Sequence, residues 1–270
     1  MVLKIKEIDE IQAPLLDHLI ELRTRLVRSV IALAVAFFVC LYFSEDIFSF
    51  LVQPLTQAFP QGEGRLIYTK LYEAFFVEIK VALFAAFFVS FPIIANQLWA
   101  FVAPGLYAKE KKALLPFLVA TPVLFVAGAS LAYFVVMPTA FKWFIGFQGT
   151  RGGLKLEALP GTGDYLDLVM QFILAFGISF LLPVLLLLLN RAGIVSRAQM
   201  AAARRYAIVA IFIVAAIATP PDVISQLMLA TPLILLFEGS LLLMWLTERR
   251  RAKEPVTDEG APDQAGTQVE

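Results

Sequence analysis

Residues 168–189 read LVMQFILAFGISFLLPVLLLLL, a stretch without a single charged side chain. A helix that spans a bilayer needs about 20 mostly apolar residues, because the hydrocarbon core is about 30 Å thick. Similar apolar blocks occupy residues 27–43, 75–98, 113–137, 206–219 and 223–246. The sequence therefore predicts six transmembrane helices.

The composition agrees with a membrane protein, since 60% of the residues are hydrophobic and six such helices would leave a soluble protein little polar surface. Inside a bilayer, backbone amides must be satisfied within a helix or a closed barrel. A barrel strand alternates apolar and polar residues, whereas residues 185–189 are all leucine. We therefore expect an all-α integral membrane protein with one helical domain.

The basic residues are distributed unevenly around these blocks. Of the 22 Lys and Arg residues, 16 lie in the N-terminal segment, the second and fourth connections and the C-terminal tail. Positively charged side chains in short loops are retained on the cytoplasmic side. The distribution therefore predicts that both termini are cytoplasmic.

These patterns divide the chain into three parts. Residues 1–26 are expected to be a cytoplasmic segment whose amphipathic helix begins after Pro14 and carries an apolar stripe from Leu15 to Leu26. Residues 27–246 form the predicted six-helix membrane domain. The tail, residues 247–270, is rich in Glu, Asp, Pro and Gly, a composition typical of disorder.

Two long connections differ in character. Residues 44–70 contain several large apolar side chains around Pro54, so we expect a structured cap rather than a free loop. Residues 138–165 contain several glycines, which favours a more mobile connection.

Prolines inside the apolar blocks predict a kinked and concave bundle, because proline cannot donate a hydrogen bond to the preceding turn. The fifth block has only 14 residues between Arg205 and Pro220, which is about 21 Å of helix. The sixth block is interrupted by Glu238. Two short C-terminal spans are therefore predicted.

Several classes of site are excluded. The formal net charge is zero, which gives nucleic acid no electrostatic hold. The chain has one histidine, His18, one cysteine, Cys40, and no GxxxxGK[ST] phosphate loop. We expect no metal ion, cofactor, catalytic residue or nucleic-acid partner, and we expect Cys40 to be buried as a small apolar side chain.

Two acidic residues on the predicted cytoplasmic side are candidates for a binding site. Glu21 precedes Arg25 by four positions, which favours a local ion pair, and Glu110 lies among lysines. Alternatively, the two carboxylates together bind a dibasic ligand. Arginine suits such a site best, because a guanidinium donates two parallel hydrogen bonds to a carboxylate.

Several motifs resemble those of the TatC family, the receptor subunit of the twin-arginine translocase. They include HLIELR at residues 18–23, QPL at 53–55, WAFVAPGLY at 99–107, AYFVVMP at 132–138, FGISF at 176–180 and TPPDVISQ at 219–226. Glu110 follows the third of these motifs. The resemblance extends over residues 14–245, in order and with family-like spacing.

The resemblance implies a cup-shaped protein of six helices in the bacterial cytoplasmic (inner) membrane that binds the twin-arginine signal peptides of folded proteins. In the family, the acids matching Glu21 and Glu110 contact the arginine pair, with Arg23 and Phe101 at the same cytoplasmic site. Implied partners are the single-span TatA and TatB proteins, the lipid bilayer and further copies of the chain. Transport would be driven by the proton-motive force, without an enzymatic reaction.

The resemblance also draws attention to residues away from this site. Pro54 and Asp222 match outer-face positions at which substitution impairs transport, and Tyr133 lies in a matching motif. Glu238 is an intramembrane acid, a class that is costly and commonly functional. Many relatives carry a polar residue, often Glu, where this chain has Leu181, and Gln171 could offer only a weaker hydrogen bond.

The chief alternative is a proton-coupled small-solute secondary transporter. Such a protein needs ionisable groups that converge near the middle of the membrane, and four of the six blocks contain almost none. An intramembrane protease would need a histidine within the membrane, and His18 lies outside the blocks. The charge pattern therefore favours a docking receptor.

Overall fold

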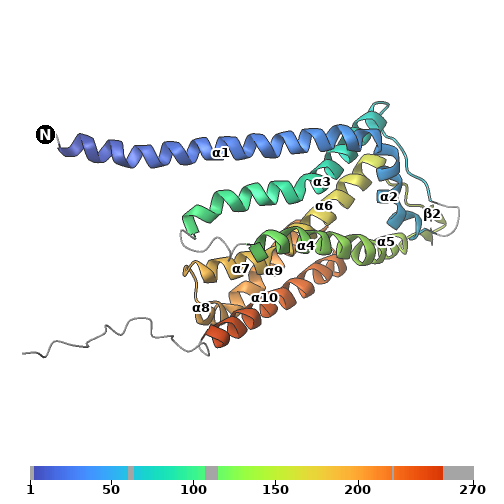
Figure 1. The fold of residues 1–270 in the computed structure, drawn as a ribbon. Helices are drawn as coiled ribbons and strands as arrows, with labels where there is room; N and C mark the ends of the chain where they lie inside the picture. Colours follow the sequence, from blue (N-terminus) through green and yellow to red (C-terminus); the bar gives the residue numbers. More distant parts are fainter. Residues whose placement is uncertain (1–2, 60–63, 107–114, 221, 252–270) are drawn as a thin grey trace, which may run out of the picture.

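The computed structural model describes residues 3–59, 64–106, 115–220 and 222–251. Apart from one short hairpin, the regular elements in these residues are helices (Figure 1). In chain order they are α1 (Leu3–Tyr42), α2 (Ser44–Thr56), α3 (Glu73–Leu106), α4 (Leu115–Leu131), the π-helix η2 (Ala132–Val136), α5 (Met137–Ile145), β1 (Gly149–Arg151), β2 (Leu154–Leu156), α6 (Thr162–Ser179), α7 (Leu182–Arg191), α8 (Arg197–Ala202), α9 (Arg204–Ala218) and α10 (Val223–Arg251).

Within this part of the chain, five helical segments are long and apolar enough to cross a membrane. They run over His18–Tyr42, Glu73–Phe101, Pro116–Ile145, Thr162–Arg191 and Val223–Arg249. The remaining predicted span corresponds to α9, which has 15 residues and is therefore about 23 Å long. The structure confirms a mostly helical membrane protein and a short α9.

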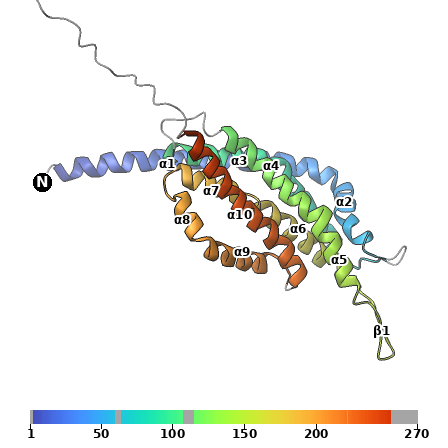
Figure 2. The ribbon, with the colours of Figure 1, turned by 90° about the horizontal axis from the view of Figure 1, so that it is seen from below.

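The two ends of the bundle contain different elements (Figures 1 and 2). One end, which we call the α8 end, holds the start of α1, the end of α3, α8 and the end of α10. The opposite end, which we call the α2 end, holds α2, the hairpin β1–β2 and the start of α6. The N-terminus of α1 and the C-terminus of α10 thus lie at the same end.

The predicted connection 138–165 is partly regular in structure. Its first residues continue the third span as α5. The hairpin that follows pairs Gly149 with Leu156 and projects from the α2 end (Figure 2). Gly152 and Gly153 form its turn with φ of +58° and +84°, a left-handed conformation that glycine adopts without steric cost.

The prediction that Glu238 interrupts the sixth span and leaves it short is wrong, because α10 runs through Glu238 and is 29 residues long. The Glu238 carboxylate is paired with Arg204 at 2.6 Å. This pairing offsets the cost of an acid on an apolar helix. At the other end of the chain, α1 passes through Pro14 and Val27 without a break, so the amphipathic segment and the first span form one helix.

Of the prolines inside the predicted spans, Pro183 lies at a helix break, whereas α3, α4 and α10 continue through Pro92, Pro122 and Pro232. The fourth span is divided into α6 and α7 at Phe180–Leu181, and Pro183 is the second residue of α7. The third span changes to the π-helix η2 immediately before Pro138. In both places proline lacks the amide that would bond the carbonyl four residues earlier, and the preceding turn breaks or widens.

Phenylalanine rings fill the crossing of α4 and α6, where Phe125, Phe172 and Phe176 are fully buried. A Cβ on Gly128 would lie 2.5 Å from the Phe176 carbonyl oxygen, and a Cβ on Gly177 would lie 2.7 Å from the Phe125 ring. Only glycine at these two positions lets the helices approach so closely.

The packing of α1 on α3 uses small side chains. Cys40 and Ala36 on α1 are buried in one cluster with Ala82 and Ala86 on α3. The prediction that Cys40 is a buried, small apolar residue is confirmed. This contact aligns α1 with α3 up to the α8 end, where the candidate site lies.

Candidate functional site

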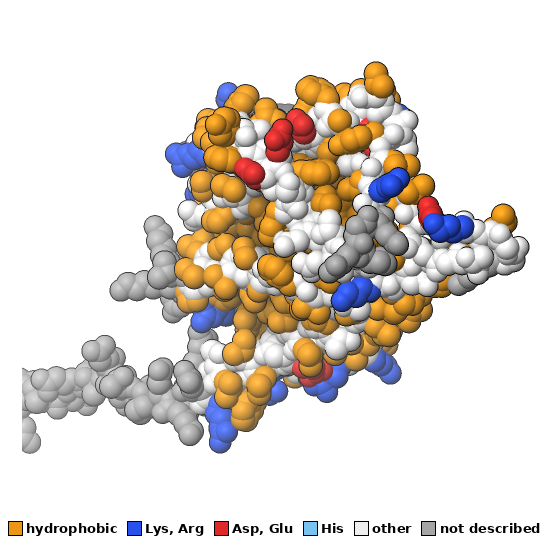
Figure 3. Space-filling model, turned by 90° about the vertical axis from the view of Figure 1, so that its right-hand side faces the viewer, with side chains coloured by type: hydrophobic (Ala, Val, Ile, Leu, Met, Phe, Trp, Pro, Cys, Tyr) orange, Lys and Arg blue, Asp and Glu red, His pale blue; other side chains and the backbone are white. Residues whose placement is uncertain are grey.

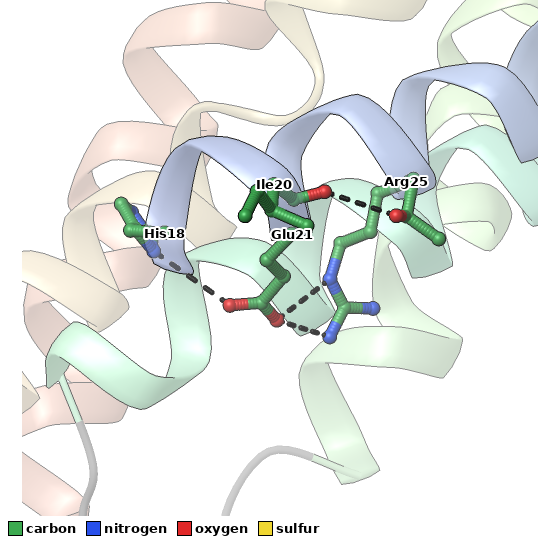
Figure 4. A network of polar contacts seen from close by, with 5 residues as sticks. His18, Ile20, Glu21 and Arg25 are labelled. Carbon is green, nitrogen blue, oxygen red and sulfur yellow. Dashed lines mark hydrogen bonds and ion pairs between the residues drawn. The ribbon is translucent and has the colours of Figure 1, made fainter. Parts of the chain in front are cut away.

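Glu21 lies on α1 at the α8 end, between two nitrogen-bearing side chains (Figure 4). Arg25 donates to Glu21 Oε1 from Nε at 2.9 Å and from Nη2 at 2.6 Å. His18 Nδ1 lies 3.6 Å from Oε2, which is too far for a good N–H···O hydrogen bond. The predicted Glu21–Arg25 ion pair is confirmed, and it occupies one of the two carboxylate oxygens.

His18 joins α1 to the end of α3. Its imidazole stacks on the Phe101 ring, with 4.2 Å between the ring centroids and 14° between the planes. The stack brings Phe101 close to Glu21, which follows His18 by three positions on the same helix face. Sequence analysis missed this role, although the HLIELR motif contains both His18 and Glu21.

The end of α3 is also attached to α4. Trp99 Nε1 donates to Thr121 Oγ1 at 2.7 Å, and the Thr121 hydroxyl donates to the Phe117 carbonyl at 2.7 Å. Phe101 lies two residues after Trp99, so its ring is positioned from α1 by His18 and from α4 through Trp99.

The structure does not show the other two predicted site residues, Arg23 and Glu110, next to Glu21. Arg23 is exposed on α1 and lies about 200° around the helix from Glu21, since each residue turns an α-helix by about 100°. Glu110 lies within 107–114, outside the residues that the structure describes. The meeting of Glu21 with Glu110 therefore stays a prediction.

The arrangement around Glu21 suits a cationic ligand. The Glu21 side chain is 33% exposed, so a ligand can reach it. Oε2 can accept a charge-assisted hydrogen bond, and a guanidinium next to it would also lie near the aromatic pair of His18 and Phe101. Because Arg25 already holds Oε1, an incoming cation must share the carboxylate with Arg25.

At the α2 end, Pro54 and Tyr133 are linked through one carbonyl group. Pro54 lies inside α2 and has no amide hydrogen, so the Phe50 carbonyl four residues earlier loses its helical donor. The Tyr133 hydroxyl donates to that carbonyl at 2.6 Å, and the Tyr133 and Phe50 rings stack 4.4 Å apart. Tyr133 thus replaces the hydrogen bond that Pro54 removes.

A second buried tyrosine holds α2 from α6. The Tyr165 hydroxyl donates to the Leu51 carbonyl at 2.8 Å, and the side chain is only 4% exposed. Leu51 and Pro54 lie on the buried face of α2. The prediction that residues 44–70 include a structured cap is therefore confirmed.

Ionic and backbone contacts join α3 to α6 at the same end. The Glu73 carboxylate accepts hydrogen bonds from the amides of Thr69 at 2.7 Å and Gly163 at 2.8 Å. Lys80 donates to both carboxylate oxygens of Asp167 at 2.9 Å. Figure 3 views the molecule from this end, where charged side chains of both signs are scattered among hydrophobic ones.

Asp222 caps the start of α10. Its Oδ1 accepts a hydrogen bond from the Ser225 amide at 2.7 Å, as an N-cap aspartate does. Asp222 is only 8% exposed. One residue further, Gln226 Nε2 donates to the Phe212 carbonyl of α9 at 3.3 Å. Asp222 and Gln226 together hold the turn between α9 and α10.

Glu238 is paired across two helices. Arg204 at the start of α9 reaches its two carboxylate oxygens at 2.6 Å from Nε and 2.9 Å from Nη2. Near the end of α10, Glu248 accepts from Arg197 of α8 at 2.8 Å. These two ion pairs attach α8 and α9 to α10.

The Leu181 side chain lies in apolar surroundings. Leu181 packs against the buried cluster of Phe91, Ala95 and Phe125. Gln171 donates from Nε2 to the Ala218 carbonyl at 3.4 Å. This long hydrogen bond links α6 to the end of α9, and a bond from Gln171 to a partner helix stays a prediction.

Buried ionisable groups are scarce in the described residues. Their buried polar side chains are Asp222, Cys40, Tyr133, Tyr165 and several Ser and Thr residues, and the one carboxylate among them, Asp222, lies at a helix terminus. No group of His, Cys, Asp or Glu side chains that could hold a metal ion occurs among the residues described. A proton-coupled solute transporter would need ionisable groups in the middle of the membrane, so this alternative gains no support.

Comparison with known proteins gives a consistent result. The family model described as "Sec-independent protein translocase protein (TatC)" matches residues 17–232. A protein of that name from Magnetococcus marinus is 50% identical over 251 residues, covering 93% of this chain and 90% of its own length. The protein of that name from Escherichia coli is 40% identical over 225 residues, covering 83% of this chain and 85% of its own length.

Solved structures agree with these sequence matches. A crystal structure titled "Crystal Structure of Twin Arginine Translocase Receptor- TatC" superposes with a TM-score of 0.72 at 38% sequence identity. The match covers 86% of this chain and all of the solved chain. The likeness therefore extends to the sequence as well as to the fold.

Proposed function

This chain belongs to the TatC family, and we propose that it recognises the twin-arginine signal peptides of folded proteins. Family membership makes it a multi-pass bacterial membrane protein and a component of a protein translocase, not an enzyme. One observation carries the proposal of signal-peptide recognition. The stack of His18 on Phe101 puts the partly exposed Glu21 carboxylate next to the end of α3.

The proposed topology has six spans, with α9 as the short fifth span, in the cytoplasmic (inner) membrane. The N-terminus of α1 and the C-terminus of α10 share the α8 end, and the basic residues gather in the segments expected there. The positive-inside rule then favours a cytoplasmic α8 end and cytoplasmic termini. Glu21 would meet the signal peptide on the side where the cargo is synthesised.

In the proposed complex, one arginine of the signal peptide binds Glu21 through Oε2 and the other binds Glu110. Glu110 is nine residues beyond Phe101, in the connection that follows α3. Two carboxylates on separate segments can engage two guanidinium groups at once, and each charge-assisted hydrogen bond adds directional specificity. Arg23, at the cytoplasmic surface of α1, would contact another part of the same peptide.

The remaining predicted residues are proposed to maintain the shape that transport requires. Pro54 and Tyr133 act together on α2, Asp222 holds the turn between α9 and α10, and Glu238 ties α9 to α10. Single-span TatA- and TatB-type proteins and further copies of this chain are the proposed partners. Export of folded cargo would use the proton-motive force.

A photo-crosslinking experiment tests the recognition site. A twin-arginine signal peptide with a photoreactive residue next to the arginine pair is added to membrane vesicles that contain the protein. Glu21→Gln and Glu110→Ala should each lose most of the crosslinked product, because a neutral side chain cannot pair with a guanidinium. Glu45→Gln, which alters an exposed acid of α2, is the matched control and should crosslink as the wild type does.

Two results would contradict the assignment. If Glu21→Gln crosslinks as much signal peptide as the wild type does, Glu21 is not part of the binding site. Equal losses in Glu45→Gln would show that the effect reflects folding or membrane insertion, which protease protection of the vesicles would reveal separately.

A further inference from the structure

A groove of about 420 Å³ lies between α4, α7 and α10, on surfaces that the proposed function does not use. Its volume is within the range of small-molecule sites in proteins. The described lining residues from α4 and α7 include Phe117, Leu124 and Leu187, and α10 contributes Leu235 and Leu243. The groove is therefore apolar along its length.

The groove exists because small side chains line part of it. Gly239 and Ser240 of α10 face Ala120 of α4 across the space. A Cβ added to Gly239 would have no atom within 4 Å, whereas the glycines at the α4–α6 crossing leave no such room. Gly239 thus opens a space that a larger side chain could fill without distorting the backbone.

One charged residue, Arg191 at the end of α7, is among the described lining residues. Its guanidinium lies 5.4 Å from the centre of the Phe117 ring, at the end of the groove where α4 begins. The hydroxyls of Ser240 and Thr247 donate to carbonyls of their own helix at 2.6 and 2.8 Å. The groove therefore combines apolar walls with one cationic end.

The length of the groove matches one leaflet of a bilayer. Leu235 and Thr247, the two extreme lining residues on α10, are twelve positions apart and about 18 Å apart along the helix axis. Half of a hydrocarbon core is about 15 Å thick. Thr247 lies near the α8 end, so the cationic end is where lipid head groups would lie.

We propose that this groove binds an anionic phospholipid, with one acyl chain along α10 and the phosphate group at Arg191. The acyl chain would replace solvent or loosely packed lipid against the apolar walls, and the phosphate would accept hydrogen bonds from the guanidinium. The cationic end favours a lipid with an anionic head group over an apolar partner helix, which offers no charge to Arg191. The bound lipid would stabilise the contact of α4 and α7 with α10.

Native mass spectrometry of the purified full-length protein tests this proposal. The delipidated protein in detergent is mixed with equal amounts of phosphatidylglycerol and phosphatidylcholine that carry the same acyl chains. The wild type should retain phosphatidylglycerol with about a fivefold preference, as expected for one basic residue next to an anionic lipid. Soluble glycerol phosphate in equal amount should not displace it, because it has no acyl chain.

Four variants separate the contributions of the cation and of the open space at Gly239. Arg191→Gln should lower the preference to near unity but keep lipid bound, and Lys142→Gln, which removes an exposed cation of α5, should behave as the wild type. Gly239→Leu should fill the groove and lose the selectively bound lipid, whereas Gly239→Ala should retain it. Equal binding of both lipids by the wild type, or undiminished selective binding by a folded Gly239→Leu, would overturn the proposal.

Discussion

The two ends of the bundle are held together in different ways. At the α2 end, hydrogen bonds and ion pairs connect residues that are 80 to 114 positions apart, through Tyr133, Tyr165, Lys80 and the amide of Gly163. At the α8 end, Glu21 is paired, among the residues that the structure describes, only with neighbours on its own helix, and the stack of His18 on Phe101 joins α1 to α3. The comparison indicates a rigid α2 end and, around Glu21 at the α8 end, a site whose charged groups can change partners.

The largest expected effect concerns Pro54 and Tyr133. Tyr133→Phe leaves the Phe50 carbonyl without a donor, which should lower the free energy of unfolding by about 1–3 kcal/mol. In a Pro54→Ala background, the restored amide can donate to that carbonyl, so the same tyrosine change should cost less. Thermal unfolding of the two single variants and the double variant in detergent measures this coupling, and strictly additive effects would contradict the proposed link.

Tyr165→Phe should have the next largest effect. Removing the hydroxyl loses the hydrogen bond to the Leu51 carbonyl, and a typical buried hydrogen bond contributes about 1 kcal/mol. Hydrogen exchange in α2 should become faster, with little change at the start of α1. Equal changes at the two ends would show that the α2 end is not an independent rigid unit.

A smaller effect is expected at His18. Replacing His18 by Ala removes the stack on Phe101, and aromatic pairs contribute about 0.5–1.5 kcal/mol. Converted to a ratio of dissociation constants, this energy means that signal-peptide binding should weaken by about 2- to 13-fold. His18→Phe keeps an aromatic ring and should restore most of the affinity in a titration with labelled peptide. If His18→Ala and His18→Phe both lose affinity, the polar imidazole nitrogens of His18 are needed for binding, and the ring stack alone is not enough.

The smallest effect is expected for Arg204 and Glu238. Both side chains are 40–50% exposed in the protein alone, and exposed ion pairs contribute about 0–1 kcal/mol. Arg204→Gln should therefore change the melting temperature little. A large loss of stability would indicate that the surrounding lipid makes this pair behave as a buried one.

Local patterns in the sequence predict much of this fold. The apolar blocks predict the long helices, the spacing of Glu21 and Arg25 predicts their ion pair, and Pro183 predicts the break near Leu181. These features depend on residues within a turn or two of one another. Glu238 shows the limit of such reasoning, because its partner Arg204 lies on another helix and keeps α10 continuous.

The candidate site is predictable only in part for the same reason. The family-like motifs identify Glu21 and Phe101 as site residues, but no local rule pairs His18 with a ring 83 positions away. The hydrogen bond from Tyr165 to the Leu51 carbonyl likewise depends on how α6 packs against α2. Contacts between distant segments are set by packing, which the order of residues alone does not reveal.

The central claim is that the acids at positions 21 and 110 meet one signal peptide, and disulfide trapping tests it most directly. In a Cys40→Ala background, a single cysteine replaces Thr24, one turn from Glu21, or Ala108, two residues before Glu110. A signal peptide with a cysteine beside its arginine pair is then added under mild oxidation. We predict adducts at both positions and none for Thr56→Cys at the α2 end. Adducts at only one of the two positions, or at neither, would contradict the account.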